Sequence, residues 1–140
     1  MANTLQQFAE RVKRDIEAKI RTLKAMDGIT LSVGIDPTAK YPDGKSVAEV
    51  ADFVEYGTRY MPPRPFMRNA KSENAAAWRG RLRRAVERSL KTGEPIEPLL
   101  ETVAQKMKSD VQESIMAEGA YRPCRLHDSV VASVTTGAGG

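Results

Sequence analysis

The sequence predicts an α+β fold, in which a small antiparallel or mixed sheet is packed with an N-terminal amphipathic helix and two long helices. Apolar residues recur at steps of three and four over three long stretches, which is the helical period. Two shorter stretches have the alternation or the Val, Ser and Thr content of strands. Aromatic residues make up only 6% of the 140 residues, which favours helices on a small sheet over a large β-sandwich. We therefore expect one domain over residues 1–140.

The first predicted helix runs from Asn3 to Met26 and ends at Asp27-Gly28. Its apolar residues fall on one stripe, which we expect to pack against the sheet. They are Leu5, Phe8, Val12, Ile16, Ile20 and Leu23. A half-buried strand follows, because apolar residues then occupy every second position, at Ile29, Leu31, Val33 and Ile35.

A loop from Asp36 to Lys45 joins this strand to the next helix and is longer than such connections usually are. Two interpretations stay open for it, a contact arm and a tolerated surface insertion. Ser46-Val47-Ala48-Glu49 is a capping box that opens a short helix through Tyr56, with Gly57 just past its end.

Glu55 lies in the last turn of that helix, where the helix dipole disfavours an anion. This local conflict predicts a cationic partner for Glu55, and Arg59, Arg64 and Arg68 are the nearest candidates. Arg64 stands between two prolines in an extended backbone, which suits a bidentate pair with a carboxylate such as Glu55, within the subunit or across subunits.

The connection that follows contains three prolines within four positions, at Pro62, Pro63 and Pro65. Proline fixes φ and removes a backbone donor, so this segment cannot be helix interior or central strand. We expect an extended connection of low conformational entropy. Phe66 is interpreted either as a hydrophobic anchor in the core or as part of an edge for subunit contact.

Two long helices and a strand complete the predicted fold. The first helix has Pro65 in its first turn and continues to about Lys91, and the second runs from Pro95 to Glu118 with Gly119 as its stop. Leu126 to Thr135 is rich in Val, Ser and Thr and is predicted to be a strand. We expect residues 136–140 to form a flexible tail.

The segment Val-Glu-Tyr-Gly-Thr, at residues 54–58, and Pro-Pro-Arg-Pro-Phe-Met-Arg, at residues 62–68, resemble the signature of the tail-component or tail-completion family of long-tailed bacteriophages. The order of the predicted elements and a Leu-x-Asp-Ser-Val segment at Leu126–Val130 also fit that family. The chain departs from it before this last segment, where Arg125 to Ser129 lacks the Asp-Thr-Gly turn that family members often carry.

The resemblance implies a structural virion protein of a tailed phage or prophage, which forms an oligomeric ring at the neck or proximal tail end and helps join tail to head. Its implied partners are other copies of itself, six in the first expectation, and neck and tail proteins such as a connector or adaptor and the tail tube. The implied location is the virion, and the host cytoplasm during assembly. The candidate subunit-interface residues are Glu55, Tyr56, Gly57, Thr58, Pro63, Arg64, Pro65, Phe66 and Arg68.

Basic residues are concentrated in one segment of the chain. Residues 64–91 hold nine Lys or Arg against two Glu, a net of +7 in a chain whose total is +4. Such a segment suits a solvated face, an acidic neighbouring subunit, or the phosphates of DNA passing through a channel. The candidate basic-face residues are Arg79, Arg81, Arg83, Arg84 and Arg88. The alternative function is a DNA-binding accessory protein that uses the arginine-rich helix 67–91.

No catalytic, cofactor-binding or metal-binding set is predicted. His127 is the single histidine, and it stands beside Asp128 and Ser129 in a predicted strand, where consecutive residues alternate faces. Cys124 is the single cysteine, and Cys124 with His127 falls short of the four ligands of a structural zinc site. No run is long and apolar enough for a membrane span and no signal peptide is evident, so we expect no membrane partner.

Overall fold

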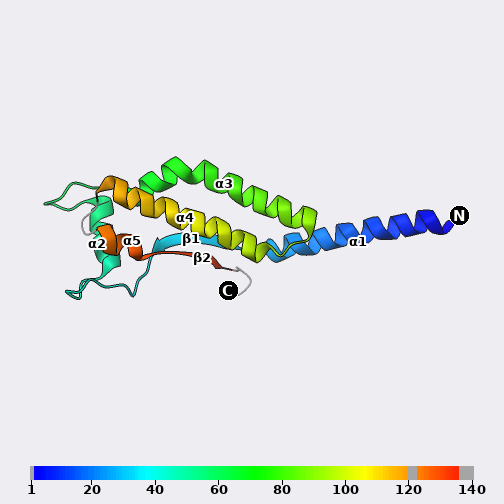
Figure 1. The fold of residues 1–140 in the computed structure, drawn as a ribbon, viewed down its shortest axis with the longest axis horizontal. Coiled ribbons are helices and arrows are strands. Elements are labelled where there is room, and N and C mark those ends of the chain that lie inside the picture. The colour runs from blue at the N-terminus through cyan, green and yellow to red at the C-terminus, as the bar shows by residue number, and fades with distance from the viewer. Residues whose placement is uncertain (1, 120–122, 136–140) are drawn as a thin grey trace.

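The computed structural model describes residues 2–119 and 123–135 of the chain. The α+β class is confirmed, with long helices packed on an antiparallel sheet (Figure 1). In chain order the elements are α1 (Ala2–Met26), β1 (Thr30–Ile35), α2 (Val47–Tyr56), α3 (Phe66–Thr92), α4 (Ile96–Glu118), α5 (Pro123–Asp128) and β2 (Val130–Thr135).

The long elements form three layers, with α4 between the sheet and α3 (Figure 1). Strands β1 and β2 pair antiparallel, from Thr30 opposite Thr135 to Ile35 opposite Val130. The face towards α4 carries the apolar residues of both strands, and the other face carries mostly Ser and Thr. This alternation is the predicted period of two, and it explains why a sheet this small has one covered face.

The main core lies at one end of the molecule, where α2 and α5 close over the start of α3 and the end of α4. Phe66, Ile115 and Leu126 are essentially inaccessible to solvent there. Tyr41 of the 36–45 loop joins this core with 3% of its surface exposed. Arg125 donates two hydrogen bonds to the Lys40 carbonyl oxygen, at 2.9 and 2.7 Å. The loop is therefore pinned at both Lys40 and Tyr41, which argues against the contact-arm interpretation.

A second, smaller core lies at the other end, between α3, α4 and the start of the sheet. It is built on Ala85, Ile96, Leu100 and Val103. Between the two cores, the indole Nε1 of Trp78 on α3 donates to the Asp110 carboxylate on α4 at 2.7 Å. These contacts hold α3 and α4 together along their length.

Helix α1 does not pack against the sheet as expected; it continues outward from the start of β1, away from the other elements (Figure 1). All six residues of its apolar stripe are exposed, from 40% at Val12 to 76% at Leu5. Only its last turn reaches the second core, through Met26. The stripe was correctly located on one helix face, but periodicity does not say what covers a face.

The predicted strand 126–135 is wrong in its first residues, which form the short helix α5. Ser129 ends that helix: its hydroxyl donates to the Arg125 carbonyl at 2.7 Å, and its backbone N–H reaches the same oxygen at 3.1 Å. The Val-rich alternation starts only at Val130, so the strand starts there too. The predicted flexible tail, residues 136–140, lies outside the described residues.

Candidate functional site

The segment from Glu55 to Arg68 crosses from the end of α2 to the start of α3. Gly57 caps α2, its N–H donating to Phe53 at 2.8 Å, with φ near +77°. A Cβ at this position would lie 2.8 Å from the Pro63 nitrogen. Both the backbone angle and the close approach of Pro63 therefore require glycine. Beyond it the loop is held by a small bridge between Thr58 and Met61.

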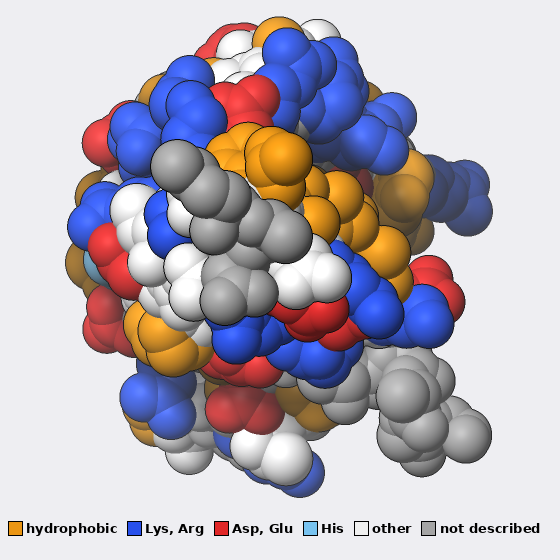
Figure 2. Space-filling model, turned by 90° about the vertical axis from the view of Figure 1, so that its right-hand side faces the viewer, with side chains coloured by type: hydrophobic (Ala, Val, Ile, Leu, Met, Phe, Trp, Pro, Cys, Tyr) orange, Lys and Arg blue, Asp and Glu red, His pale blue; other side chains and the backbone are white. Residues whose placement is uncertain are grey.

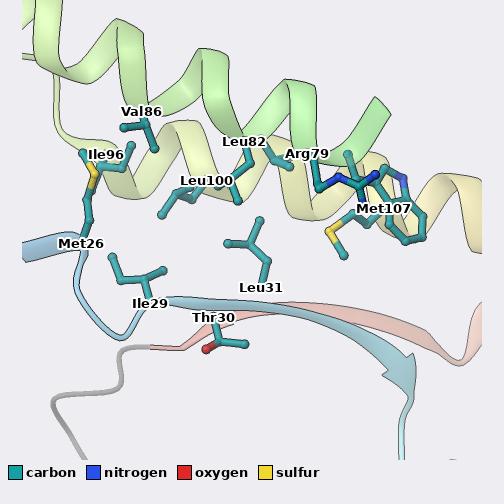
Figure 3. Close-up of a pocket in the computed structure, with 12 residues that line it drawn as sticks. Met26, Ile29, Thr30, Leu31, Arg79, Leu82, Val86, Ile96, Leu100 and Met107 are labelled. Atoms are coloured by element: carbon teal, nitrogen blue, oxygen red, sulfur yellow. The ribbon is translucent and has the colours of Figure 1, made fainter. Parts of the chain in front are cut away.

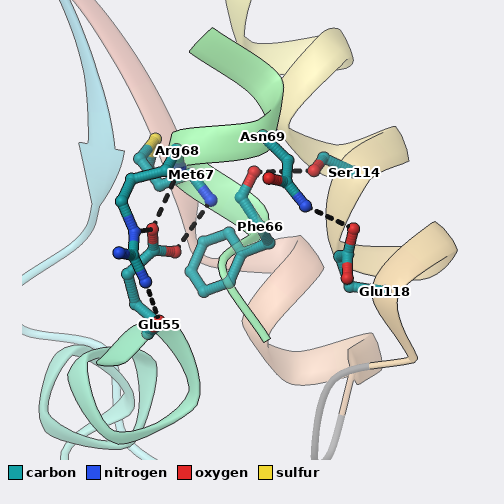
Figure 4. A network of polar contacts seen from close by, with 7 residues as sticks. All are labelled: Glu55, Phe66, Met67, Arg68, Asn69, Ser114 and Glu118. Carbon is teal, nitrogen blue, oxygen red and sulfur yellow. Dashed lines mark hydrogen bonds and ion pairs between the residues drawn. The ribbon is translucent and has the colours of Figure 1, made fainter. Parts of the chain in front are cut away.

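Glu55 is the centre of the site, and it is 95% buried. Its two carboxylate oxygens accept the backbone N–H groups of Met67 at 2.8 Å and Arg68 at 3.0 Å (Figure 4). These are first-turn donors of α3, and the N-cap residue of α3 is Pro65, which has no side-chain acceptor. A carboxylate at the end of α2 thus caps α3, and the N-terminal dipole of α3 offsets the unfavourable dipole of α2.

Arg68 is the cationic partner that Glu55 was predicted to have. Its Nε donates to the Glu55 carboxylate at 2.9 Å, and its guanidinium also donates to the Glu55 carbonyl oxygen at 2.6 Å. The guanidinium lies 4.9 Å from the centre of the Tyr56 ring, in a cation–π contact. Three of the candidate residues therefore form one cluster, which we call the Glu55 clasp: Glu55, Tyr56 and Arg68.

The expected pairing of Arg64 with Glu55 is wrong within the subunit. The Arg64 guanidinium instead donates to the carbonyl oxygen of Gly119, at the C-terminal end of α4, and its backbone N–H donates to Val54 at 2.7 Å. Positive charge at a helix C-terminus is favourable. Arg68 pairs with the Glu55 carboxylate because it lies on the first turn of α3, where its own backbone N–H also donates to that carboxylate.

Phe66 is the hydrophobic anchor of the connection, with 2% of its surface exposed. On the side away from Glu55, the Ser114 hydroxyl donates to the Phe66 carbonyl at 2.6 Å, and the Asn69 amide donates to Glu118 at 2.6 Å (Figure 4). The start of α3 is therefore fastened to α2 on one side and to α4 on the other. Of the two interpretations of Phe66, the structure favours the anchor.

The remaining candidate residues lie on the outside of this braced connection. Thr58, Pro63 and Arg64 are exposed, and Pro65 is half-buried. Tyr56 and Tyr60 expose 66% and 88% of their surface, and the Arg59 guanidinium lies over the Tyr60 ring at 5.8 Å. The loop tip thus presents aromatic rings and guanidinium groups to solvent on a fixed backbone.

The candidate basic-face arginines, Arg79, Arg81, Arg83, Arg84 and Arg88, are all exposed on α3. At 100° per residue they form two rows, Arg79 with Arg83 and Arg81 with Arg84 and Arg88. Arg88 pairs with Glu94 at 3.2 Å. The other four make no ion pair with any residue that the structure describes.

The cluster His127, Asp128 and Ser129 is not brought together for hydrolysis. His127 Nδ1 lies 3.0 Å from Asp128, whereas the Ser129 hydroxyl is engaged in ending α5. Among the described residues no three His, Cys, Asp or Glu side chains gather in one place.

One titratable group in the loop before α2 is perturbed. The Thr38 hydroxyl and backbone N–H both donate to the Asp36 carboxylate, at 2.7 and 2.8 Å, and lower the pKa of that carboxyl. Hydrogen bonds to the charged form have this effect.

Sequence reasoning missed the role of Glu55 as a helix cap, and the signal was present. The helix after Pro65 has no Ser, Thr, Asp or Asn at its N-cap, so its first donors needed an acceptor from elsewhere. It also missed the apolar groove described below, which depends on how three elements meet.

Comparison with known proteins adds no relative: no protein-family model matches the chain, and no curated protein or solved structure matches it either. None of the helices in the described ranges has the length and apolar character that crossing a membrane requires.

Proposed function

We propose that this chain is a structural virion protein of a tailed phage or prophage, forming an oligomeric ring at the neck or proximal tail end and helping to join tail to head. The observation that carries the proposal is the braced connection between α2 and α3. It has the residues that resemble the tail-completion signature, and it combines a fastened backbone with exposed aromatic and arginine side chains at its tip.

The bracing supports an interface role because it lowers the cost of binding. A loop already held in one conformation loses little entropy when a partner docks on it. Tyr and Arg side chains are the ones that contribute most often to binding at the centre of interfaces. Arg59, Tyr60 and Arg64 at the tip have this composition, and none of them is needed to fill the core.

The partners in this proposal are other copies of the chain, six in the first expectation, together with a connector or adaptor and the tail tube. The protein would act in the virion neck after assembly in the host cytoplasm. The proposal assigns no catalytic step, so the protein acts by shape and contact.

A DNA-binding accessory role is the second candidate, favoured by one observation. Arg79, Arg81, Arg83 and Arg84 are exposed and form no ion pair within the described chain. A helix with such charges can bind phosphates without reading bases. This role predicts that affinity for duplex DNA falls steeply as salt rises.

The first experiment is the native mass by light scattering at moderate salt and micromolar concentration, followed by titration with duplex DNA. A discrete closed oligomer with weak DNA binding is expected. Tyr60→Ala should weaken a contact through the loop tip, whereas Met116→Ala, an exposed apolar residue on α4, serves as the matched control. A monomer that binds DNA tightly, and loses that binding with Arg81→Ala and Arg84→Ala, would favour the second candidate instead.

A further inference from the structure

Helix α1 presents an apolar stripe that no other described part of its own subunit covers. The six side chains from Leu5 to Leu23 are each 40–76% exposed. At 100° per residue they spread over about 120° of the helix circumference, wider than the narrow seam of a two-stranded coiled coil. With about 200 Å² for a fully exposed large side chain, the stripe offers on the order of 600 Å² of apolar surface. Figure 2 views the molecule from the N-terminal end of α1 and shows apolar side chains gathered beside that end.

An apolar groove of about 420 Å³ lies at the root of α1, between the α3–α4 pair and the start of β1. Leu82 of α3 and Leu100 of α4 face Leu31 of β1 across it, and Met26 at the end of α1 closes one side (Figure 3). Leu82 is 37% exposed, so the groove is open to solvent. Its volume accommodates several Leu-sized or Ile-sized side chains.

We propose that the stripe of α1 docks in this groove of a second copy of the chain. The two surfaces have the same apolar chemistry, and both are exposed in one subunit. Within a subunit they cannot meet along their length, because α1 leads away from the groove and touches it only through Met26 (Figure 1). The stripe is therefore presented outward, where a neighbour's groove can receive it.

The stripe also has a suitable area for this occupant. A stable interface buries about 800 Å² on each partner, and the apolar stripe alone offers about three quarters of that area. The largest apolar patch on a typical monomer is about 300–600 Å², so the stripe is at the upper limit of what a monomer leaves exposed.

A second copy fits better than a lipid surface. Helices that lie on anionic membranes carry a polar face rich in Lys and Arg. The polar face of α1 is mixed, with Glu10, Asp15 and Glu17 among its basic residues, and Asp15 pairs with Lys19 at 3.2 Å. Mixed charge of this kind is typical of a helix beside protein and water.

Two copies that exchange helices reciprocally would form a closed dimer, whereas a helix passed from each subunit to the next makes a heterologous contact. Such contacts generate a ring when the rotation between subunits closes. The inference therefore rests on the proposed ring function and deepens it, by naming α1 and the groove as one of the subunit contacts.

Mixed cysteine cross-linking tests the contact. One batch carries Phe8→Cys, Val12→Cys or Ile16→Cys on the stripe, a second batch carries Leu82→Cys in the groove, and both carry Cys124→Ser to remove the native thiol. Equal amounts are mixed and oxidised. We expect a disulfide-linked pair of one chain from each batch for at least one stripe position, because a disulfide forms only when the Cα atoms come within about 7 Å. Arg14→Cys, on the opposite face of α1, is the matched control and should give none.

The second measurement is the native mass of Ile16→Glu compared with Arg14→Glu. Ile16→Glu should weaken self-association at least tenfold, and Arg14→Glu should leave it unchanged. Both positions are exposed, so circular dichroism should show the same helix content in both variants.

Four outcomes would overturn the inference. Stripe cysteines that link only to each other would indicate α1–α1 pairing, and binding to phosphatidylglycerol vesicles without any mixed pair would indicate a lipid surface. A wild-type chain that stays monomeric with no mixed pair would mean that the groove is closed by its own α1 or stays empty. A closed ring that survives Ile16→Glu but is lost with Tyr60→Ala would overturn this inference and leave the proposed function standing.

Discussion

The two ends of this molecule are built from the same kinds of residues, but only one of them has a core that is closed to solvent. At the end formed by α2, α5 and the start of α3, Phe66, Ile115 and Leu126 are shielded from solvent and the Glu55 carboxylate accepts three hydrogen bonds. At the end where α1 joins β1, a groove of about 420 Å³ stays open beside an exposed apolar helix.

The difference between the two ends shows which apolar surfaces a single chain covers by its own contacts. The closed end brings together segments from five elements, whose buried apolar residues shield one another from solvent. The open end has two helices and a strand that no further element in the described ranges covers, and the helix that could do so leads away (Figure 1). The closed end is therefore expected to carry most of the stability of the monomer, and the open end to carry association.

The largest predicted effect compares a core residue of the closed end with a groove residue of the open end. Ile115→Ala should cost about 4 kcal/mol of unfolding free energy, because it leaves a cavity in a fully packed site. Leu82→Ala should cost about 1 kcal/mol, since Leu82 already borders an open groove and is 37% exposed. Urea denaturation in the Ile16→Glu background measures both. Equal costs would mean that the groove is filled in the monomer, and the contrast between the ends would fail.

The next effect concerns the Glu55 clasp. Glu55→Ala removes the acceptor of two first-turn donors of α3 and of the Arg68 guanidinium, and it should cost about 2–4 kcal/mol. Thermal unfolding followed by circular dichroism measures the change. Glu113→Ala on the exposed side of α4 is the control and should shift stability by less than about 0.5 kcal/mol. A small effect at Glu55 would show that water replaces the clasp without loss.

A smaller effect is expected at Gly57. Gly57→Ala combines a positive φ with a Cβ placed 2.8 Å from Pro63, and it should cost about 2–3 kcal/mol. Gly44→Ala has a similar φ, +86°, with nothing near the added Cβ, so it isolates the backbone strain, which should cost about 1 kcal/mol. The difference between the two variants, from urea denaturation, measures how tightly Pro63 is held. Equal values would mean that the loop shifts freely.

The smallest effect concerns Asp36, which follows β1 at the closed end and donates its backbone N–H to the Ser129 carbonyl. Its lowered pKa contributes stability above the ordinary carboxyl pKa, and this contribution is lost as the pH falls through the folded pKa. Thr38→Val removes the hydroxyl donor, so the pKa of Asp36 should rise towards its ordinary value while the backbone donor keeps it somewhat below. Carboxyl NMR shifts against pH follow the titration. Thr102→Val removes a hydroxyl that donates to the Pro98 carbonyl within α4, and it should leave the titration curve of Asp36 unchanged.

Much of the fold could be predicted from local patterns. The positions of α1, β1, α2, α3 and α4 followed from hydrophobic period, capping residues and glycine stops, with ends that differ by one or two residues from those observed. The need of Glu55 for a cation was also predictable, because the conflict with its own helix dipole is local. The short helix α5 was not, since its six residues are too few to show a helical period.

The sequence by itself determined the elements other than α5, the faces of the long helices and strands, and the rigidity of the Pro-rich connection, because these depend on residues within a few positions of one another. Only the tertiary structure decided that Arg68 and not Arg64 pairs with Glu55, that a carboxylate of α2 caps α3, and that the stripe of α1 is left uncovered. Those outcomes depend on distances between elements far apart in the chain. An amphipathic pattern predicts which face of a helix is buried. Only the arrangement of the elements in space shows which surface covers that face.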